Sequence, residues 1–488
     1  MKRLVIVLLF ISNNIFAQLG EIAKIEITDF DNKIIWMHAF PHEDGLLNVS
    51  LVEKTLNDSW MIFNKYDLSL QKILWKDSLE VENTIQEFIY AENKNKSFWL
   101  IVENDFPNFK VISLNKKNGE LEVMLGKLPS EFDITAFRVS ENKAYLIGEK
   151  YEKSIIANFS FETFKTTFLN DIYKNNTAIS NLCTEDSTDN IHVLLNEINA
   201  KHCGLIMKNY DNESHLINTN ILPEIETVKN ENKLVFITGQ TLKLSENKTL
   251  LIGNYSKGCS EYSKGLYVTL IEDNEEKWSK MTPFIQFSNF FSHFSEKKQG
   301  RIKNKIHNKQ NIGKDPEYVY RLNIKDVIKT PNGFVLEAEV YTLQSPAASS
   351  TSPVNIISKT AYILSHAIIC EFNNEGDLIW DNTLNLNDFE TYQLNNIVQL
   401  TQIDNSWTMA YLNNNELYYK TVHANKISNH IDKLNIFNHK LSPENLYFNT
   451  WNNHYLITGV IRNNSNFKEK NHDQYFIKKI GMKNKNHN

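Results

Sequence analysis

Short apolar runs, each introduced by an asparagine, recur along most of the chain. The pattern is an Asn, one or two small or polar residues and then an apolar run, as in Asn142-Lys143-Ala144-Tyr145-Leu146-Ile147. Asn tolerates turn conformations, and the β-branched and aromatic residues that follow suit a pleated strand. We call this pattern the Asn signature. Its eight copies begin at Asn57, Asn95, Asn142, Asn190, Asn247, Asn332, Asn405 and Asn453.

The spacing of the copies predicts a repeat architecture. Apart from two longer gaps, before Asn332 and Asn405, the copies lie about 48 residues apart, which fits one four-stranded sheet per copy. We therefore expect an all-β fold, a β-propeller of seven or eight four-stranded blades with a short helical insertion. A string of unrelated β-sandwiches is the alternative.

The last copy is followed by too few strands for a complete blade. Strands are expected at residues 445–449, 455–461 and 474–480, and none after that. We expect Ile22–Ile27 or Lys33–His38 to supply the fourth strand and close the ring, since closure removes an exposed sheet edge.

The two long gaps contain predicted insertions at residues 287–312 and 344–360. In the first, four Phe residues from Phe287 to Phe294 fall at i, i+3, i+4 and i+7, which predicts one face of a helix. Ser295 is a candidate cap for the basic stretch that follows, in which Ile302 and Ile306 lie at i and i+4. The cations of this stretch are Lys297, Lys298, Arg301, Lys303, Lys305 and Lys309. The second insertion is rich in Ser, Ala and Pro, and we expect a flexible hairpin loop.

The basic insertion has two interpretations. It is either an amphipathic helical pair packed on the β-core with solvated cations, or a docking element for an acidic partner, anionic lipid or polysaccharide.

The first 17 residues have the order of a secretory signal peptide. Lys2 and Arg3 precede an apolar run, Leu4–Ile11, that is too short to span a bilayer, and Ala17 is a small residue before a plausible cut. We expect a mature chain from Gln18, a propeller-like domain over residues 18–488, and a periplasmic or secreted location. A short N-terminal anchor or a buried strand is the alternative.

The net charge and the lengths of the apolar runs exclude two classes of interaction. The net charge is −6, and without the two leader cations the acidic excess is larger. Because phosphate backbones require a clustered positive surface, we expect no nucleic acid as a general partner. No later stretch approaches 18 consecutive apolar residues, so no transmembrane helix is expected.

Four cysteines occur, and no two have the C-x-x-C spacing of zinc and redox sites. Cys183 and Cys203 flank one predicted strand, Ile191–Asn196. The two strands on either side of it would lie about 9.6 Å apart, whereas a disulfide needs Cα atoms within about 7 Å. We expect buried free thiols at both positions. Cys259 and Cys370 are the other two.

His38 and His42 have a spacing that binds zinc on a helix, but Pro41 between them disfavours that helix. Two oxygen-rich stretches, Asp29–Asn32 and Asn374–Asp377, lack the full spacing of a calcium loop, and the second is explained as a hairpin turn. We expect no metal and no cofactor.

No other motif in the sequence defines a catalytic site. Tyr-Ser-Lys-Gly occurs twice, with Ser256 beside Lys257 and Ser263 beside Lys264, but adjacent residues on a turn do not orient a base onto a nucleophile. A glycosidase pair of carboxylates cannot be chosen from sequence. The catalytic residues, if any exist, are unknown.

Two features resemble known proteins. The leader ending Phe16-Ala17-Gln18 and the hairpin Asn373-Asn374-Glu375-Gly376-Asp377-Leu378-Ile379-Trp380-Asp381 are similar to those of uncharacterised secreted Bacteroidetes proteins with a propeller-like fold. The hairpin Lys117-Asn118-Gly119-Glu120-Leu121 keeps the turn but lacks the Trp. The resemblance implies compartment and fold, and no activity or site residues.

We thus expect an exported, non-catalytic binding or scaffold module of the cell envelope or exterior, with a protein or glycan partner. The alternative is a propeller-type glycan hydrolase or lyase acting near the central axis. Sequence leaves the oligomeric state open.

Overall fold

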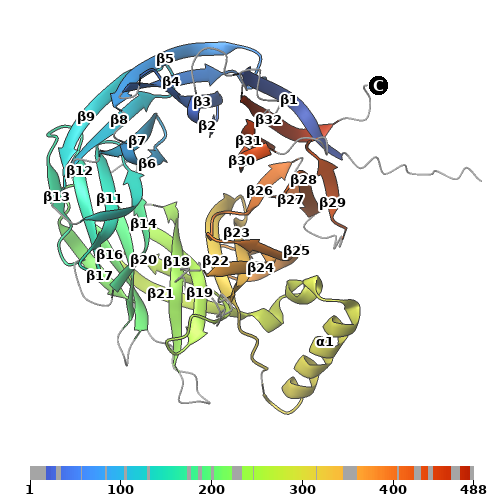
Figure 1. Cartoon of the computed structure of the whole chain (residues 1–488). Helices are drawn as coiled ribbons and strands as arrows, with labels where there is room; N and C mark the ends of the chain where they lie inside the picture. The colour runs from blue at the N-terminus through green and yellow to red at the C-terminus, as the bar shows by residue number, and fades with distance from the viewer. Residues whose placement is uncertain are drawn as a thin grey trace, which may run out of the picture.

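Eight four-stranded antiparallel sheets, arranged as blades around a central axis, form the described part of the chain (Figure 1). The computed structural model describes residues 18–28, 34–55, 58–82, 85–103, 107–128, 132–172, 177–184, 189–198, 203–222, 233–245, 247–314, 316–344, 360–403, 406–422, 430–437, 443–462 and 473–483. The predicted propeller is confirmed, and the blade number is eight rather than seven. The predicted signal peptide, Asp29–Asn32 and most of the predicted loop at 344–360 lie outside these residues.

The strands follow one another outward from the axis in each blade. Blades 1 and 2 contain β2 (Ile34–His42), β3 (Gly45–Glu53), β4 (Asp58–Tyr66), β5 (Ile73–Glu82), β6 (Ile85–Glu92), β7 (Lys96–Glu103), β8 (Asn108–Asn115) and β9 (Leu121–Lys127). Blades 3 and 4 contain β10 (Asp133–Val139), β11 (Lys143–Lys150), β12 (Lys153–Ser160), β13 (Thr166–Phe168), β14 (Thr177–Thr184), β15 (Ile191–Ile198), β16 (Cys203–Tyr210) and β17 (Leu216–Ile221). Blades 5 and 6 contain β18 (Leu234–Ser245), β19 (Lys248–Lys257), β20 (Ser263–Glu272), β21 (Glu275–Pro283), β22 (Arg321–Thr330), β23 (Gly333–Gln344), β24 (Ala361–Asn373) and β25 (Leu378–Thr391). Blades 7 and 8 contain β26 (Val398–Ile403), β27 (Ser406–Asn413), β28 (Glu416–Val422), β29 (Asp432–Asn435), β30 (Pro443–Trp451), β31 (His454–Ile461), β32 (Gln474–Lys483) and β1 (Gln18–Thr28).

The ring closes through β1. This strand pairs antiparallel with β32, from Gln18 opposite Lys483 to Thr28 opposite Gln474, and is the outermost strand of blade 8. The first of the two candidate segments therefore closes the ring, as predicted. Lys33–His38, the second, overlaps β2 of blade 1 instead. In Figure 1 the blue β1 accordingly lies beside the red β32.

The apolar core lies between blades rather than inside them. Eight clusters of buried side chains are described, and each combines residues of two consecutive blades, as Phe98 and Phe137 do for blades 2 and 3. Successive side chains of a strand point to opposite faces, so a middle strand packed on both sides is apolar at every position. In β23, Phe334 packs toward blade 5 and Val335 toward blade 7.

A disulfide corrects the expectation for the cysteines. Cys203, at the start of β16, is bonded to Cys259 in the loop between β19 and β20, with a Cα–Cα distance of 5.5 Å. Cys183, which is half-buried, and Cys370, which is buried, form no disulfide in the described part of the chain. Cys183 and Cys203 are not bonded to each other, because β15 separates their strands. Cys203 instead reaches Cys259 of the neighbouring blade.

An insertion between blades 5 and 6 carries the helical structure. It comprises two short 3-10 helices, η1 (Phe284–Gln286) and η2 (Phe290–His293), and α1 (Glu296–Gln310), before the chain returns to β22. We call residues 284–320 the arm. Figure 1 shows α1 standing out from the rim of the ring near blade 6. None of the described helices is long and apolar enough to cross a membrane.

The expectation of one continuous Phe face on a helix was wrong. Phe287 and Phe294 have extended backbone and separate the short helices from each other and from α1. Phe287, Phe290 and Phe291 are nevertheless buried, because the irregular path turns each ring into the core between blades 5 and 6. Ser295 is the N-cap residue of α1, but its side chain donates or accepts no capping hydrogen bond there.

Candidate functional site

His38 and His42 lie on β2, where strand geometry keeps them apart. Four residues of a strand span about 13 Å, so the two imidazoles cannot share one metal ion. His38 packs among Phe40 and Tyr447, and its burial lowers its pKa to about 4. Both are structural residues of the junction between blades 8, 1 and 2. In the described part of the chain, no group of three or more His, Cys, Asp or Glu residues has metal-binding geometry.

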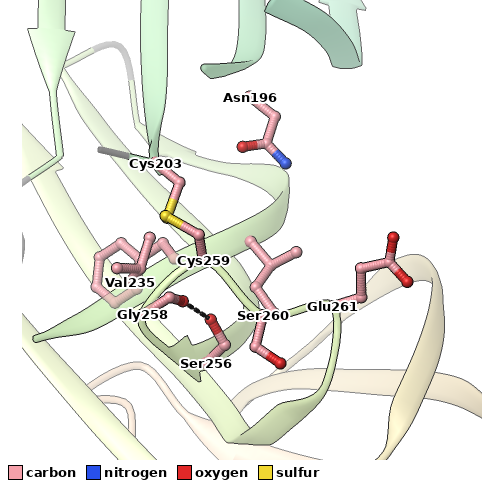
Figure 2. A pocket seen from close by; sticks show the side chains of 10 residues that line it. Asn196, Cys203, Val235, Ser256, Gly258, Cys259, Ser260 and Glu261 are labelled. Atoms are coloured by element: carbon pink, nitrogen blue, oxygen red, sulfur yellow. Dashed lines mark hydrogen bonds between the residues drawn. A yellow bond between two sulfur atoms is a disulfide. The ribbon is translucent and has the colours of Figure 1, made fainter. Parts of the chain in front are cut away.

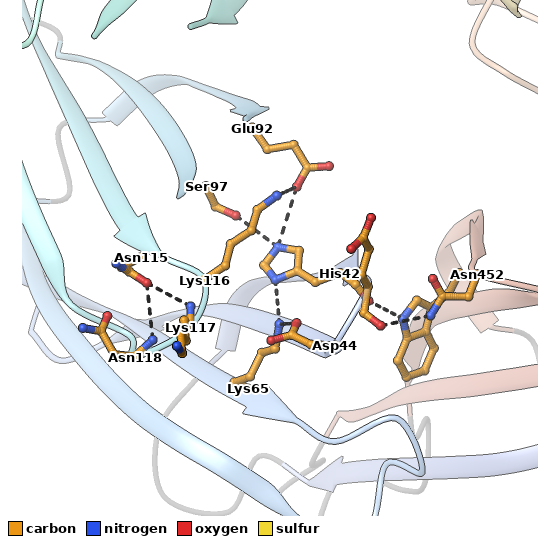
Figure 3. Close-up of polar contacts among 12 residues, drawn as sticks. His42, Asp44, Lys65, Glu92, Ser97, Asn115, Lys116, Lys117, Asn118 and Asn452 are labelled. Atoms are coloured by element: carbon orange, nitrogen blue, oxygen red, sulfur yellow. Dashed lines mark hydrogen bonds and ion pairs between the residues drawn. The ribbon is translucent and has the colours of Figure 1, made fainter. Parts of the chain in front are cut away.

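A buried polar cluster surrounds His42 and has the look of a catalytic site (Figure 3). Ser97 Oγ lies 3.1 Å from His42 Nε2, and Lys65 Nζ lies 2.8 Å from Nδ1. Lys65 is also 2.6 Å from a carboxylate oxygen of Asp44. Glu92 closes the cluster by accepting from Tyr90 and pairing with Lys116.

The protonation pattern rules out Ser97 as a nucleophile activated by His42. A lysine ammonium is a donor only, so Nδ1 accepts from Lys65 and the ring proton resides on Nε2. Nε2 then donates to Ser97 and cannot take its proton. Burial, followed by the charge of Lys65, lowers the pKa of His42 to about 3. Lys65 and Ser97 are both fully buried, which leaves no access for a substrate.

The cluster instead joins three blades. Trp451 of blade 8 donates from Nε1 to the backbone oxygen of His42 at 2.9 Å, while Ser97 and Glu92 belong to blade 2. Its buried members, His42, Lys65 and Ser97, have hydrogen-bond partners within the cluster, and an unpaired polar group at these buried positions would be costly.

A second buried ionic group joins blades 6 and 7. Lys325 Nζ lies 2.7 Å from Glu339 Oε1, and neither side chain is more than 5% exposed. The same carboxylate oxygen accepts from the backbone N–H groups of Ile397 and Val398. These contacts occupy the charges that a catalytic acid or base would need.

Both Ser-Lys pairs are structural. Ser256 and Ser263 lie opposite each other at the ends of β19 and β20, not on a turn, and both are buried. Ser256 donates to the backbone oxygen of Gly258, and Ser263 accepts from Asn254. Lys257 and Lys264 pair with Glu317 rather than with a serine.

The oxygen-rich stretch at Asn374–Asp377 is a hairpin turn, as expected. Gly376 has a φ of 80°, which the turn requires and which glycine adopts without strain. Asp377 receives Lys280 on one oxygen at 2.6 Å and Asn373 on the other, so its carboxylate is occupied.

The hollow beside the disulfide is too small for an organic ligand. It measures about 70 Å³ and is lined by Cys203, Cys259, Ser256 and their neighbours (Figure 2). Figure 2 shows Ser256 turned toward Gly258 within it. A wider hollow of about 730 Å³ lies between the outer strands of blades 2 and 3, beside Phe109 and Phe164.

The arm holds the most distinctive surface, which we call the basic groove. It is a hollow of about 360 Å³ between α1 and the residues that lead into β22. Its lining consists of Phe294, Lys298, Arg301, Ile302, Lys305, Tyr318 and Tyr320.

Helical spacing places the cations of the groove on one side of α1. Lys298, Arg301 and Lys305 are at i, i+3 and i+7, and all three are exposed. Lys298 Nζ lies 3.4 Å from the centroid of the Phe294 ring, and Lys305 Nζ lies 5.8 Å from that of Tyr318. In the described part of the chain, no carboxylate pairs with any of the three cations.

The aromatic wall is held from behind. The Tyr318 ring packs edge-on against Phe291, and Tyr320 packs against Phe284 and Phe290. Burial raises the pKa of Tyr318, and burial together with Tyr318 raises that of Tyr320 to about 12. Both phenols are therefore neutral donors at physiological pH. Ser263 exchanges backbone hydrogen bonds with Tyr320, which fixes this wall to blade 5.

The base of the arm is anchored on blade 6. The Asp381 carboxylate accepts the N–H groups of Ser288 and Asn289, each at 2.7 Å, and the Asn289 side chain donates to the Asp381 backbone. The His293 ring stacks on that of His366 at 3.8 Å. Gln299 of α1 donates to the backbone oxygen of Phe294 at 2.7 Å. The groove thus stands on a fixed support.

Sequence reasoning found the cations and the Phe residues but missed the aromatic wall. Tyr318 and Tyr320 follow α1 in an irregular stretch with no periodicity, so no pattern linked them to the helix. The buried charges of β23 could have been found in the sequence, since Glu337 and Glu339 interrupt a strand that is otherwise mainly apolar.

Comparisons with known proteins give weak likenesses only. No family model matches the chain, and no curated protein matches it. Among solved structures, the polysaccharide lyase Uly1 is similar with a TM-score of 0.40 and 9% identity, over 80% of this chain and 89% of that one. The β-propeller domain of the Trilobed protease from Pyrococcus furiosus gives a TM-score of 0.36 and 9% identity, over 78% and 93%. Synechocystis apocarotenoid oxygenase gives a TM-score of 0.30 and 7% identity, over 50% of this chain and 61% of that one. The fold assignment rests on the strand pairing of this chain, and no activity is transferred from these proteins.

Proposed function

We propose that the protein is a non-catalytic binding module of the cell envelope or exterior, and that the arm docks an anionic ligand in its basic groove. The observation that carries this proposal is the convergence of Lys298, Arg301 and Lys305 beside aromatic rings on a rigidly anchored support. A cationic, partly walled hollow raises the local concentration of anions and strengthens each contact relative to open water.

The buried ionic clusters support binding over catalysis. The groups that first suggest chemistry, Ser97, His42 and Glu339, are occupied by one another and by backbone, and they are inaccessible. The alternative of a glycan hydrolase or lyase gains no support from a described residue.

The proposed compartment is the periplasm or the exterior, reached through the predicted signal peptide. The Cys203–Cys259 disulfide supports it, because such bonds persist in oxidising compartments. We also propose kinship with the secreted Bacteroidetes proteins that the leader and hairpin resemble.

The test is binding of the full chain to two immobilised polyanions, polygalacturonate and poly-L-glutamate, at increasing salt. We expect retention on at least one, weakening as salt screens the charges. The double variant Arg301→Glu/Lys305→Glu should lose it.

The matched control is Lys303→Glu/Lys314→Glu, which makes the same charge change on exposed residues of the arm outside the groove lining. Equal loss in both variants, or no retention of the parent protein on either polyanion, would contradict the proposal.

A further inference from the structure

The basic groove has two kinds of wall, and a ligand must match both. One side presents cationic heads from α1, and the other presents the rings of Tyr318 and Tyr320. Either wall alone would fit many ligands. A cationic helix face alone attracts any anion, and an aromatic ring alone accepts any flat apolar group.

From this combination we infer that the occupant is an acidic polysaccharide whose sugar rings carry carboxylates, such as a polyuronate. This inference rests on the proposed function and deepens it. A pyranose ring has an apolar face of C–H groups that stacks on an aromatic ring, and its carboxylate projects from the ring edge. One sugar can therefore contact Tyr318 with its face while its carboxylate reaches Lys305 or Arg301.

The spacing along α1 suits a chain of such sugars. Lys298 and Lys305 are seven residues apart, which corresponds to about 10 Å of helix. That length is comparable with a disaccharide, so cations recur along the groove as carboxylates recur along a polyuronate. The Lys298 ammonium and the Arg301 guanidinium both donate to carboxylate oxygens, Arg in a bidentate manner.

The tyrosine hydroxyls add a second preference for sugars. Their pKa values are raised, so they stay protonated and donate hydrogen bonds to sugar oxygens. Glu317, the residue next to Tyr318, is ionised, since the hydrogen bond from Lys264 lowers its pKa. Its negative charge is offset by Lys264 and Lys257, which both pair with it, so it repels an anionic ligand only weakly.

An acidic peptide fits the same charges less well. An extended peptide needs partners for its backbone N–H and C=O groups. The groove lining is helix surface and aromatic ring, and the backbone of Tyr320 is already paired with Ser263. A peptide would also present no flat apolar face to Tyr318.

The experiment compares three soluble ligands on the full chain by calorimetric titration at physiological salt. They are an oligogalacturonide, its methyl-esterified form of equal length, and an oligoglutamate of equal charge. We expect the oligogalacturonide to bind most tightly, the ester to lose at least about tenfold in affinity, and the oligoglutamate to bind more weakly.

Two substitutions of Tyr318 separate stacking from folding. Tyr318→Phe keeps the ring and should retain most of the affinity for the oligogalacturonide. Tyr318→Ala should weaken it by roughly fivefold to tenfold while leaving oligoglutamate binding unchanged.

The outcomes distinguish this inference from the function it rests on. Suppose that oligoglutamate binds as tightly as the oligogalacturonide and that Tyr318→Ala has no selective effect. The inference of a polyuronate ligand is then wrong, and the result favours an acidic protein as the ligand of the groove. If the ester binds as well as the acid, the carboxylate contacts are wrong. If neither acid binds, both the inference and the proposed anionic docking fail.

Discussion

Single residues show how this fold replaces water with matched polar contacts at blade junctions. Lys65 is fully buried because His42 and Asp44 accept its hydrogen bonds, and Lys325 is buried because Glu339 and a backbone oxygen accept its own. Buried charges are tolerated only when paired in this way.

At the residue scale, His38 should make the protein sensitive to acid. Burial lowers the pKa of His38 from 6.5 to about 4. Between these pH values, His38 is therefore protonated in the unfolded chain and neutral in the folded protein. The stabilisation is complete above pH 6.5 and is lost as pH falls toward 4, to the extent of about 3 kcal/mol. His38→Phe should reduce the dependence of unfolding free energy on pH in this window without abolishing it, because burial also lowers the pKa of His42 to about 3 and that of His293 to about 4.

The control for this prediction is Phe40→Leu, which disturbs a ring that contacts His38 but removes no ionisable group, so it should leave the pH slope unchanged. Denaturant titrations at closely spaced pH values measure both. An equal slope for the His38 variant and the parent protein would show that His38 is protonated in the native state or exposed there.

Residues also explain why the Asn signature was informative yet imprecise. In seven copies the signature Asn falls in the sequence between the first and second strands of a blade, but Asn57 precedes the third strand, β4. The true equivalent in blade 1 is the turn before Gly45, which contains no Asn. Beside two of these copies, the left-handed residue is the one before the signature Asn, namely Asp189 or Asn452.

At the scale of elements, strands were predictable and the arm was only partly so. Apolar runs with turns between them recur in every blade, and local patterns suffice for them. The Phe residues of the arm gave a helical period by coincidence, because Asp381 sets the path of Ser288 and Asn289, which lie 93 and 92 residues before it in the chain. No local pattern contains such a contact.

The Phe rings should account for the stability of the arm, and its cations should not. Phe290 is fully buried against Phe284, Tyr320 and His366, so Phe290→Ala should cost about 3–5 kcal/mol of unfolding free energy. Arg301→Glu/Lys305→Glu should leave the melting temperature nearly unchanged, since exposed charges contribute little. Thermal unfolding of the two variants tests this assignment. If Phe290→Ala left the melting temperature unchanged while the charge reversal unfolded the protein, this assignment would be the wrong way round.

At the scale of the whole molecule, the disulfide should hold blades 4 and 5 together. It links residues 56 apart in sequence, and removing such a bond typically costs about 2–4 kcal/mol. Cys203→Ser/Cys259→Ser should lower the midpoint of denaturant unfolding, and a reductant should lower that of the parent protein by a similar amount. Cys183→Ser is the control, because Cys183 forms no disulfide in the described part of the chain. A reductant effect that persists in the double variant would show that another bond is responsible.

The pairing of β1 with β32 closes the ring and is also a property of the whole molecule. A chain that lacked residues 18–28 would leave β32 as an open edge and would expose Phe476, Ile480 and their neighbours in the core between blades 7 and 8. We expect such a truncated chain to self-associate, and an added peptide of residues 18–28 to restore the monomer-like elution of the full chain. Identical elution of the full and truncated chains in size-exclusion chromatography would contradict this role.

The central claim is that ligand binding occurs on the arm and not at the axis of the ring. Hydrogen–deuterium exchange of the full chain, with and without oligogalacturonide, tests it most directly. The account predicts that added protection is confined to residues 294–305 and 316–320, and disappears in Arg301→Glu/Lys305→Glu. Protection instead on the innermost strands, at β2 and β30 around His38 and Tyr447, or in the outer hollow beside Phe109 and Phe164, would contradict it.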